Sequence, residues 1–387
     1  MANQTGRRDI LKGSVALAGL GVLGLPEWAF PALAQGETLA EFTDLPDTIT
    51  LERSPESRII DVRMIEDVLT PREQFFTTQH YGHPEIDGAA FRLRVSGLVD
   101  RELALSLDEL RDMETRELVF GFECSGNRGP LNGLSSNGRW TGVSLRTVLD
   151  RAGVQNRARE FVFFGADHGE EEVAFRGQIH TVDQQYGRSL RRDTALSPEP
   201  LLAYALNGEP LTRHQGFPLR LLVPGWYGAP NVKYLSEIHA QEDQYLGKFQ
   251  ARWYRTLKGE MVNGEMKWKE TAITRMQLKS FIARVTTNGQ RHQVFGVVLN
   301  DGTPLRSVEV KVDDGGWQSA TLDPSTSSTY SWKFFTWDWH GATPGEHTIV
   351  SRVTDVNGAV QPTEEELGSK RTFLEHNVQV PRTVMIV

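Results

Sequence analysis

Cysteine is nearly absent from this chain of 387 residues, which contains Cys124 alone. A single cysteine excludes a disulfide within the chain, and there is no C-x-x-C pair for a zinc or redox site. The thiol is therefore inert, reactive or bound to a metal. Unpaired thiols are usually buried as small apolar groups, but Cys124 lies in the polar segment 121–128, GFECSGNR. This setting favours a functional thiol, either a metal ligand or the nucleophile of a cysteine–histidine hydrolase.

The chain also lacks an excess of basic residues. Its formal net charge is −8 at pH 7, and an acidic surface does not suit binding to nucleic acid. It suits a basic protein partner such as a small cytochrome, and it equally suits plain solubility. Long apolar runs are missing as well, because Val15–Leu25 is too short and too rich in glycine for a membrane span.

Twin arginines stand ahead of that apolar stretch. The order Arg7-Arg8, then Val15–Leu25, then Ala32-Leu33-Ala34 is typical of a twin-arginine export signal with an A-x-A cleavage site. We predict a signal over residues 1–34 that is cleaved after Ala34, a periplasmic mature protein and no stable membrane span. An uncleaved anchor is the alternative. Because this route exports folded proteins, it favours a cofactor that is bound before export.

Two regions of different character follow the signal. Residues 40–274 combine predicted strands at 91–98, 159–165 and 218–223 with short predicted helices at 105–110 and 145–152, which favours an α+β domain. Residues 275–387 predict strands at 281–285, 293–299, 307–312, 330–337 and 347–354, with Asn-Gly and Asp-Gly turns among them. The second region therefore predicts an all-β, immunoglobulin-like sandwich, to which we assign dimerisation through a two-fold interface.

Common hydrolase motifs are absent too, since neither H-E-x-x-H nor G-x-S-x-G occurs. Four polar clusters stand out in the first region, at residues 75–80 (FFTTQH), 121–128, 214–233 and 252–255 (RWYR). The third cluster contains G-F-P-x-R and then a glycine-rich loop that ends at Lys233. Backbone amides of such a loop, together with its flanking cations, favour the binding of an anion.

These clusters, in this order and ahead of a β-sandwich, resemble the sulfite oxidase family of molybdenum enzymes. The resemblance covers nearly the whole mature chain. It rests on C-[AS]-G-N at 124–127, G-F-P-x-R at 216–220, P-G-x-x-G-x-x-x-V-K at 224–233 and a tyrosine at 254. It implies a molybdopterin-binding domain of the sulfite oxidase type over residues 40–274, with molybdenum on molybdopterin as the cofactor. No heme domain precedes this region in the chain, so it resembles the exported bacterial type.

The resemblance also implies a role for each matching residue. Cys124 would ligate molybdenum through its thiolate, and Tyr254 would hydrogen-bond the substrate or the reactive group and help to manage a proton. Arg371 would reach from the sandwich towards the substrate anion, with Lys370 as the alternative. The expected cofactor-binding residues are His80, Cys124, Arg128, Asp167, Gln215, Arg220 and Lys233. Taken singly, each of these is as consistent with an ordinary loop residue as with a ligand, and the joint pattern favours binding.

Two positions depart from the family pattern. Sulfite oxidases place arginines where this chain has Thr78 and Gly129. Guanidinium groups hold small oxyanions well, so their loss predicts weaker sulfite binding, by about 1.5–3 kcal/mol for each charge-assisted hydrogen bond. Either other arginines compensate, or the substrate is larger or less charged, for example a sulfane sulfur on a carrier protein. The candidates for compensation are Arg128, Arg139 and Arg252.

Together these expectations predict a periplasmic molybdenum oxidoreductase, present as a homodimer. It would transfer an oxygen atom to sulfite or a related sulfur compound and pass electrons to an external c-type cytochrome. Three alternatives stay open. They are the sulfane dehydrogenase subunit of a thiosulfate-oxidising complex, a sulfoxide-type reductase that works in the opposite direction, and a non-catalytic exported binding protein.

Overall fold

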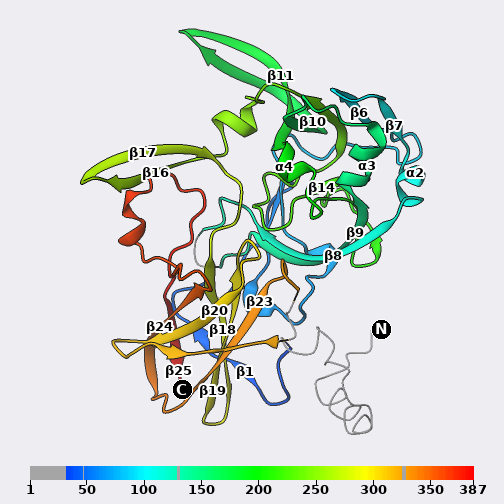
Figure 1. The fold of residues 1–387 in the computed structure, drawn as a ribbon. Coiled ribbons are helices and arrows are strands. Elements are labelled where there is room, and N and C mark those ends of the chain that lie inside the picture. The colour runs from blue at the N-terminus through cyan, green and yellow to red at the C-terminus, as the bar shows by residue number, and fades with distance from the viewer. Residues whose placement is uncertain (1–31, 47, 129–130, 325–327) are drawn as a thin grey trace.

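The computed structural model describes residues 32–46, 48–128, 131–324 and 328–387, and two bodies built mainly of strands make up the molecule (Figure 1). The twin arginines and the apolar stretch of the predicted export signal lie outside these residues. Within the described part of the chain, no helix is long and apolar enough to cross a membrane.

In the described residues the first body contains four sheets and three short α-helices. One sheet has the strand order β11-β10-β15-β6-β7, a second has the order β13-β12-β9-β8 with β14 paired to β12, a third joins β3, β4 and β5, and the fourth is a two-stranded hairpin over residues 255–272. The strands of the first three sheets are β3 Glu52–Ser54, β4 Ser57–Arg58, β5 Thr77–Thr78, β6 Leu93–Gly97, β7 Leu103–Leu105, β8 Thr115–Glu123, β9 Ser135–Ser144, β10 Glu160–Phe175, β11 Gln178–Arg191, β12 Leu201–Leu206, β13 Glu209–Pro210, β14 Arg220–Leu222 and β15 Leu235–Gln241. The helices are α2 Leu107–Arg111, α3 Leu145–Ala152 and α4 Arg192–Ala195, with 3-10 turns η1 Val62–Met64 and η2 Arg72–Gln74.

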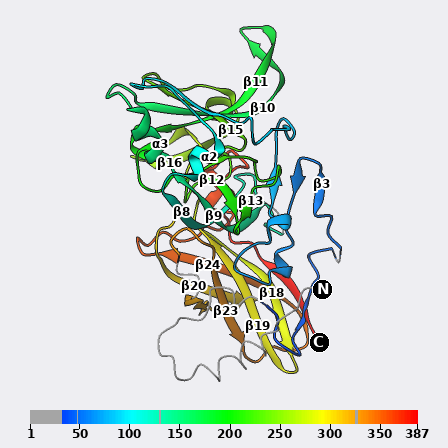
Figure 2. The ribbon, with the colours of Figure 1, turned by 90° about the vertical axis from the view of Figure 1, so that its right-hand side faces the viewer.

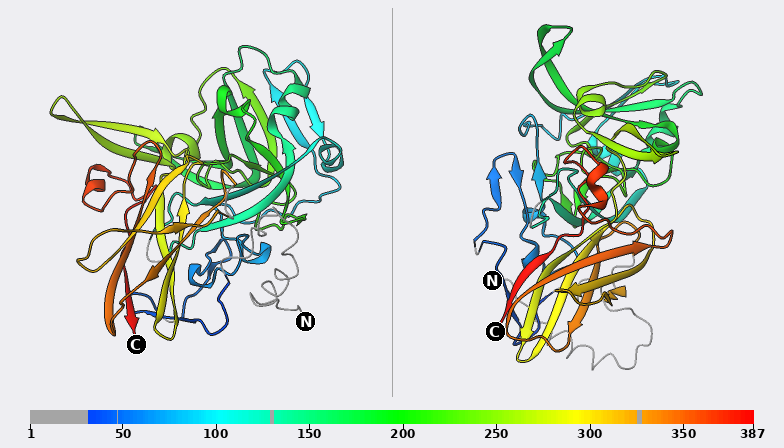
Figure 3. Two further views of the ribbon diagram at one scale, coloured as in Figure 1. Left: turned by 60° about the horizontal axis from the view of Figure 1, so that its bottom comes forward. Right: turned by 90° about the vertical axis from the view of Figure 1, so that its left-hand side faces the viewer.

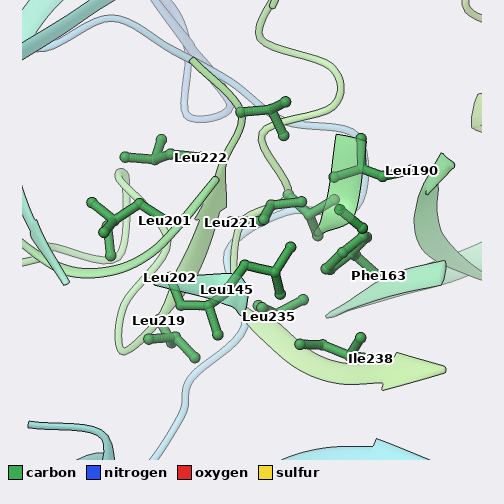
Figure 4. Packing of buried hydrophobic residues seen from close by; sticks show 14 of the residues in the cluster. Leu145, Phe163, Leu190, Leu201, Leu202, Leu219, Leu221, Leu222, Leu235 and Ile238 are labelled. Carbon is green, nitrogen blue, oxygen red and sulfur yellow. The ribbon is translucent and has the colours of Figure 1, made fainter. Parts of the chain in front are cut away.

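Helix α3 shows how the sequence directs local structure in this body. Its buried side chains recur at helical spacing and form one apolar face, made of Leu145, Val148, Leu149 and Ala152. Gly153 ends the helix with a φ of 72° and donates its N–H to the carbonyl of Leu149. Figure 4 shows Leu145 packed among the leucines of β12 and β14 in the core of the first body. This core fixes the strands whose ends carry the polar clusters.

Two long hairpins project from the first body (Figure 1). One joins β10 (Glu160–Phe175) to β11 (Gln178–Arg191), and the other joins β16 (Arg255–Val262) to β17 (Glu265–Ala272). The strand predicted at 159–165 is confirmed, but it continues to Phe175. No strand was predicted over 255–272, although Asn263-Gly264 is a hairpin turn signal with Met261 and Met266 at alternating positions beside it. The outer part of this hairpin, residues 260–271, is exposed, so burial does not mark it as a strand.

The second body is a sandwich of two five-stranded sheets (Figures 2 and 3), with the orders β1-β18-β19-β23-β22 and β2-β25-β24-β20-β21. Its strands are β18 Lys279–Asn288, β19 Arg291–Leu299, β20 Leu305–Val312, β21 Gln318–Ser319, β22 Thr321–Leu322, β23 Lys333–Trp339, β24 Gly345–Asp355 and β25 Arg382–Ile386, with a 3-10 turn η5 at Glu366–Ser369. Apolar side chains from both sheets, such as Phe281, Val310 and Val353, form one buried core. The five strands predicted here are confirmed, whereas the immunoglobulin type and the dimer interface stay predictions.

The sandwich also takes in the start of the described chain. β1 (Thr38–Leu39) pairs with β18, and β2 (Glu41–Phe42) pairs with β25 near the other end of the chain. Arg382 Nη1 lies 3.3 Å from Asp44 Oδ2 beside this second pairing. A strand of two residues is too short to show an apolar pattern, so no local feature predicts that residues 38–42 belong with the sandwich. The division at residues 274 and 275 itself stays a prediction.

Candidate active site

One pocket of the first body collects side chains from segments that are far apart in the sequence. It opens between β5 (Thr77–Thr78), the loop after β8 (Thr115–Glu123), a bulge in β10, the glycine-rich loop after β14 and the residues after the π-helix η3 (Lys248–Arg252). The lining consists of Phe76, Thr77, Thr78, Gln79, His80, Phe122, Cys124, Asp167, Tyr186, Arg220, Gly228, Ala229, Asn231, Lys233 and Tyr254. Six of the predicted site residues, His80, Cys124, Asp167, Arg220, Lys233 and Tyr254, are thus brought together.

Cys124 directly follows the last residue of β8, and a turn fixes its backbone. Its N–H donates to the carbonyl of Leu134 at 2.9 Å, and its carbonyl accepts from the N–H of Asn127 at 2.8 Å. Burial raises the pKa of the Cys124 thiol to about 11, although the N–H of Gly126 favours the thiolate. The thiol by itself is therefore protonated at neutral pH, and a bound metal cation is what would stabilise the thiolate at this position.

Two cations lie in the pocket wall, and neither forms a salt bridge with a carboxylate of the described residues. Arg220 is buried, and its guanidinium donates to the carbonyls of Gln215 at 2.8 Å and Asn231 at 3.1 Å. The Lys233 ammonium donates to Thr77 Oγ1 at 2.7 Å. Burial lowers the pKa of Arg220 to about 9 and lowers the pKa of Lys233 as well. Two desolvated positive charges next to each other favour an anion in this pocket.

Asp167 is placed by an irregularity in β10. The register of β10 with β11 shifts between Phe164 and His168, and Asp167 enters the pocket lining at this bulge. Its Oδ2 accepts from Gln79 Nε2 at 2.8 Å, while its buried Oδ1 has no hydrogen-bond partner among the described residues. Burial raises the pKa of Asp167 to about 6. A polar ligand edge that donates to this oxygen would satisfy it.

His80 and Tyr254 form a hydrogen-bonded pair at the other side of the pocket. His80 Nε2 lies 2.7 Å from Tyr254 Oη, and the imidazole stacks against Phe249 with ring centroids 4.9 Å apart. Burial, helped by the Lys248 and Lys233 ammonium groups, lowers the pKa of His80 to about 4. Burial also raises the pKa of Tyr254 well above its ordinary value. Both groups are therefore neutral near pH 7, and the tyrosine keeps its proton.

The donors and acceptors of the pocket fit a molybdenum–molybdopterin cofactor. Cys124 offers one soft sulfur ligand, and the described residues contain no group of three or more His, Cys, Asp or Glu side chains that could hold a metal alone. Arg220 and Lys233 suit the phosphate of such a cofactor, and the unpartnered atoms Arg220 Nε and Asp167 Oδ1 suit its polar edges. The metal would thus take one ligand from the protein and others from the cofactor.

Three predicted residues do not line this pocket. Gln215 is buried behind it and donates through Nε2 to the carbonyl of Arg72 at 2.7 Å. The Arg128 guanidinium lies 4.9 Å from the centre of the Phe373 ring. The Arg371 guanidinium lies over Trp268 of β17, at 5.2 Å from the ring centre. Gly129 lies outside the described residues.

A second cavity lies on the other side of the Cys124 loop. It is lined by Arg128, Glu364, Leu367, Lys370, Thr372, Phe373 and His376. Gly126 lies between the thiol and one wall residue of this cavity, because a Cβ built on Gly126 would meet Cys124 Sγ at 3.8 Å and the Phe373 ring at 3.7 Å. The Lys370 Nζ is buried there without a hydrogen-bond partner among the described residues, and burial lowers the pKa of Lys370 to about 8.

Sequence reasoning missed several residues that shape the site. Tyr186 of β11 stacks on His80 with centroids 5.8 Å apart, and Phe249 packs against the same ring. Gln79 holds Asp167, although it was seen only as part of the first cluster. None of these residues belongs to a motif. For Tyr186 the only available signal was a buried aromatic residue in a strand, which more often indicates core packing.

Comparison with known proteins points to one family. Residues 80–249 match the family model described as the oxidoreductase molybdopterin binding domain. The chain is 29% identical over 331 residues to mitochondrial sulfite oxidase of Rattus norvegicus, an alignment that covers 77% of this chain and 58% of that protein. It is 36% identical over 209 residues to sulfite oxidase of Gallus gallus, covering 50% of this chain and 44% of that protein.

These matches support a member of the sulfite oxidase family. They also support a molybdopterin-binding oxidoreductase domain with molybdenum on molybdopterin as its cofactor, as predicted. The chain spans about 58% of the length of the mitochondrial sulfite oxidases that it matches.

A solved structure shares the fold of this chain over most of both chains. The sulfane dehydrogenase SoxCD from Paracoccus pantotrophus superposes with a TM-score of 0.71 and covers 90% of this chain and 91% of that chain, at 22% sequence identity. At this identity the likeness shows the fold.

Proposed function

We propose that the chain is a periplasmic molybdenum oxidoreductase that oxidises sulfite or a related sulfur compound by oxygen-atom transfer. Two electrons then leave one at a time to an external c-type cytochrome, and the sandwich, which we expect to be immunoglobulin-like, forms a homodimer. The observation that carries the proposal is the pocket itself. It joins one soft sulfur, two buried cations and a protonated tyrosine within a single lining.

The bound cofactor would supply the two-electron chemistry and the oxygen atom. Cys124 would hold the metal through its sulfur, and the charges of Arg220 and Lys233 would neutralise the cofactor phosphate. The backbone acceptors of Arg220, the carbonyls of Gln215 and Asn231, keep its guanidinium at one place in the wall. Gln79 orients Asp167 so that one carboxylate oxygen is left for the cofactor.

Tyr254 and His80 would manage the proton of the reaction. The Tyr254 hydroxyl keeps its proton at neutral pH, so it donates a hydrogen bond to an oxygen anion of the substrate or product. His80 is the neutral partner that holds the hydroxyl in place at 2.7 Å. Phe249 and Tyr186 fix the imidazole plane and exclude water from this side.

The cations of the second cavity would attract an anionic substrate. Arg128 and Lys370 line it, and its wall residue Phe373 lies next to Gly126, which follows the thiol by two positions. We propose that Lys370, rather than Arg371, meets the substrate charge, because Lys370 Nζ has no hydrogen-bond partner among the described residues while the Arg371 guanidinium lies over Trp268.

An assay of the cofactor-loaded enzyme tests the function directly. Cytochrome c reduction is followed with sulfite, with thiosulfate and with a sulfane-carrying protein as electron donors. Turnover of at least one donor, with a molybdenum atom in each protein molecule, is the expected result. Turnover of none, while a dye donor drives sulfoxide reduction, would replace the proposal with the reductase alternative.

A sulfane dehydrogenase is the second candidate, and Thr78 is the observation that favours it. This residue lines the pocket where the family pattern places an arginine. A small dianion such as sulfite would therefore have one guanidinium group fewer to bind it. We predict that Thr78→Arg lowers the KM for sulfite about tenfold, as expected for about 1.4 kcal/mol from one charge-assisted hydrogen bond. Steady-state rates with sulfite measure this. An unchanged KM would show that the threonine does not set the substrate.

A further inference from the structure

One ion pair in the described residues has both side chains fully buried, and it adjoins the active-site cysteine. Lys279 Nζ lies 3.0 Å from Glu123 Oε2, with side-chain exposures of 0% and 1%. Lys279 is the first residue of β18 in the sandwich, and Glu123 is the last residue of β8 in the first body. The pair therefore links the two bodies at the residue that precedes Cys124.

The same ammonium group also holds the residue that closes the turn. Lys279 Nζ donates to the carbonyl of Asn127 at 3.0 Å. Asn127 Nδ2 in turn donates to Glu123 Oε2 at 2.8 Å, and Asn127 Oδ1 accepts from the N–H of Leu134 at 3.0 Å. One side chain of the sandwich thus contacts the loop on both sides of Cys124, at Glu123 and at Asn127.

Backbone contacts complete the clamp on this loop. The carbonyl of Ser125 accepts from the N–H of Glu375, which lies in the segment after η5, at 2.6 Å. The carbonyl of Glu123 accepts from the N–H of Gly228 at 2.8 Å. The Cys124 side chain is left to line the pocket. The loop backbone is therefore held from both bodies while its sulfur faces the site.

Stability alone is a poor reason for a buried ion pair. Removing two charges from water costs about as much as their attraction returns, and apolar residues of similar volume often serve stability as well or better. A charged pair with fixed hydrogen-bond geometry instead selects one arrangement of the groups around it.

We propose that Lys279, with Glu123 and Asn127, positions the Cys124 sulfur for the metal, so that the sandwich forms part of the metal site. This inference rests on the proposed role of Cys124 as the molybdenum ligand. Lys279 acts through the loop and touches neither substrate nor cofactor, so it is a positioning residue.

Three variants of the full-length enzyme separate positioning from stability. Lys279→Met leaves a carboxylate unpaired, Glu123→Gln leaves an ammonium unpaired, and the double variant leaves neither. We expect both single variants to lose thermal stability and the double variant to regain it. We also expect the double variant to keep at least fivefold less molybdenum than the wild type, with an altered thiolate–metal absorption band. A double variant that matches the wild type in stability, molybdenum and absorption would overturn the inference.

The single cysteine allows a second readout that needs no metal. A thiol reagent labels Cys124 alone in the full-length chain prepared without cofactor. We expect labelling at least ten times faster in the double variant, because its loop is no longer fastened. Val310→Ala, which removes buried side-chain volume from β20 in the same sandwich, is the matched control and should label like the wild type.

The two hypotheses fail in different ways. If the wild-type enzyme contains no molybdenum after correct maturation, the proposed function is wrong, whatever the results for the variants. If the thiol is labelled at equal rates in the wild type and the double variant, Lys279 does not position Cys124, even when the wild type carries its full molybdenum content.

Discussion

At the scale of single residues, removing the Tyr254 hydroxyl tests the proposed proton donor with little change to the surrounding packing. Tyr254→Phe keeps the ring next to Phe249 but deletes the hydrogen bond to His80. We expect kcat to fall about 10²-fold, as is typical for the loss of a positioned proton donor, while the molybdenum content stays unchanged. Steady-state kinetics with a dye acceptor measure kcat. Tyr245→Phe, at a tyrosine outside the pocket lining, is the control, and an equal loss there would contradict the assignment.

Lys370 and Arg371 are neighbours with different surroundings, so they form a matched pair. The Lys370 ammonium is buried in the second cavity without a hydrogen-bond partner among the described residues, whereas Arg371 donates to the carbonyl of Gly368 at 3.0 Å. Lys370→Met should raise the KM for an anionic sulfur substrate about tenfold with little change in kcat. Arg371→Met should leave KM within twofold. The reverse order of effects would restore Arg371 as the substrate residue.

Residue types alone could indicate much of the site. The motifs around Cys124, Arg220 and Lys233 led to residues that line one pocket, because such motifs combine a soft ligand with cations and loop amides. They could not show that Gln215 lies behind the wall, or that Arg128 faces Phe373. The direction of a side chain depends on packing against distant segments, which no local pattern records.

At the scale of elements, the bulge in β10 is what brings Asp167 into the pocket. Gly165 permits it, because a Cβ at this position would lie 2.3 Å from Asp167 Oδ1 and 2.8 Å from the carbonyl of Lys233. Gly165→Ala should cost about 1–3 kcal/mol in the free energy of unfolding and lower the cofactor content. Denaturant unfolding and metal analysis check this. Gly316→Ala, where a Cβ meets nothing within 4 Å, should change neither.

Strands of the sandwich were predictable from their apolar residues, whether one face or both are buried. β24 alternates buried and part-exposed side chains from Ile349 to Asp355, whereas β18 is buried over Lys279–Thr286. The hairpin of β16 and β17 was missed although Asn263-Gly264 is a turn signal, because its apolar residues, such as Met266 and Trp268, are exposed and belong to no core. Strands as short as β1 and β2 depend entirely on partners hundreds of residues away.

At the scale of the whole molecule, the net charge of −8 affects the rate of association with a charged partner. If the acceptor is a basic cytochrome, raising the ionic strength from about 10 to 150 mM shortens the Debye length from about 30 to 8 Å. The kcat/KM for the cytochrome should then fall about tenfold. An uncharged dye acceptor should show no such dependence. A cytochrome rate that does not change with salt would contradict electrostatic steering.

The pairing of β2 with β25 has a consequence for how this protein is made. Glu41 and Phe42 take Met385 and Val384 as their register partners, so this sheet joins residues more than three hundred positions apart. Loop closure over such a separation is slow, and the nascent chain exposes the unpaired edge of this sheet until β25 has been made and has paired. Val384 and Ile386 of β25 are part of the buried core between the two sheets. The core that supports β18, and with it Lys279, is therefore complete only after β25 has joined it.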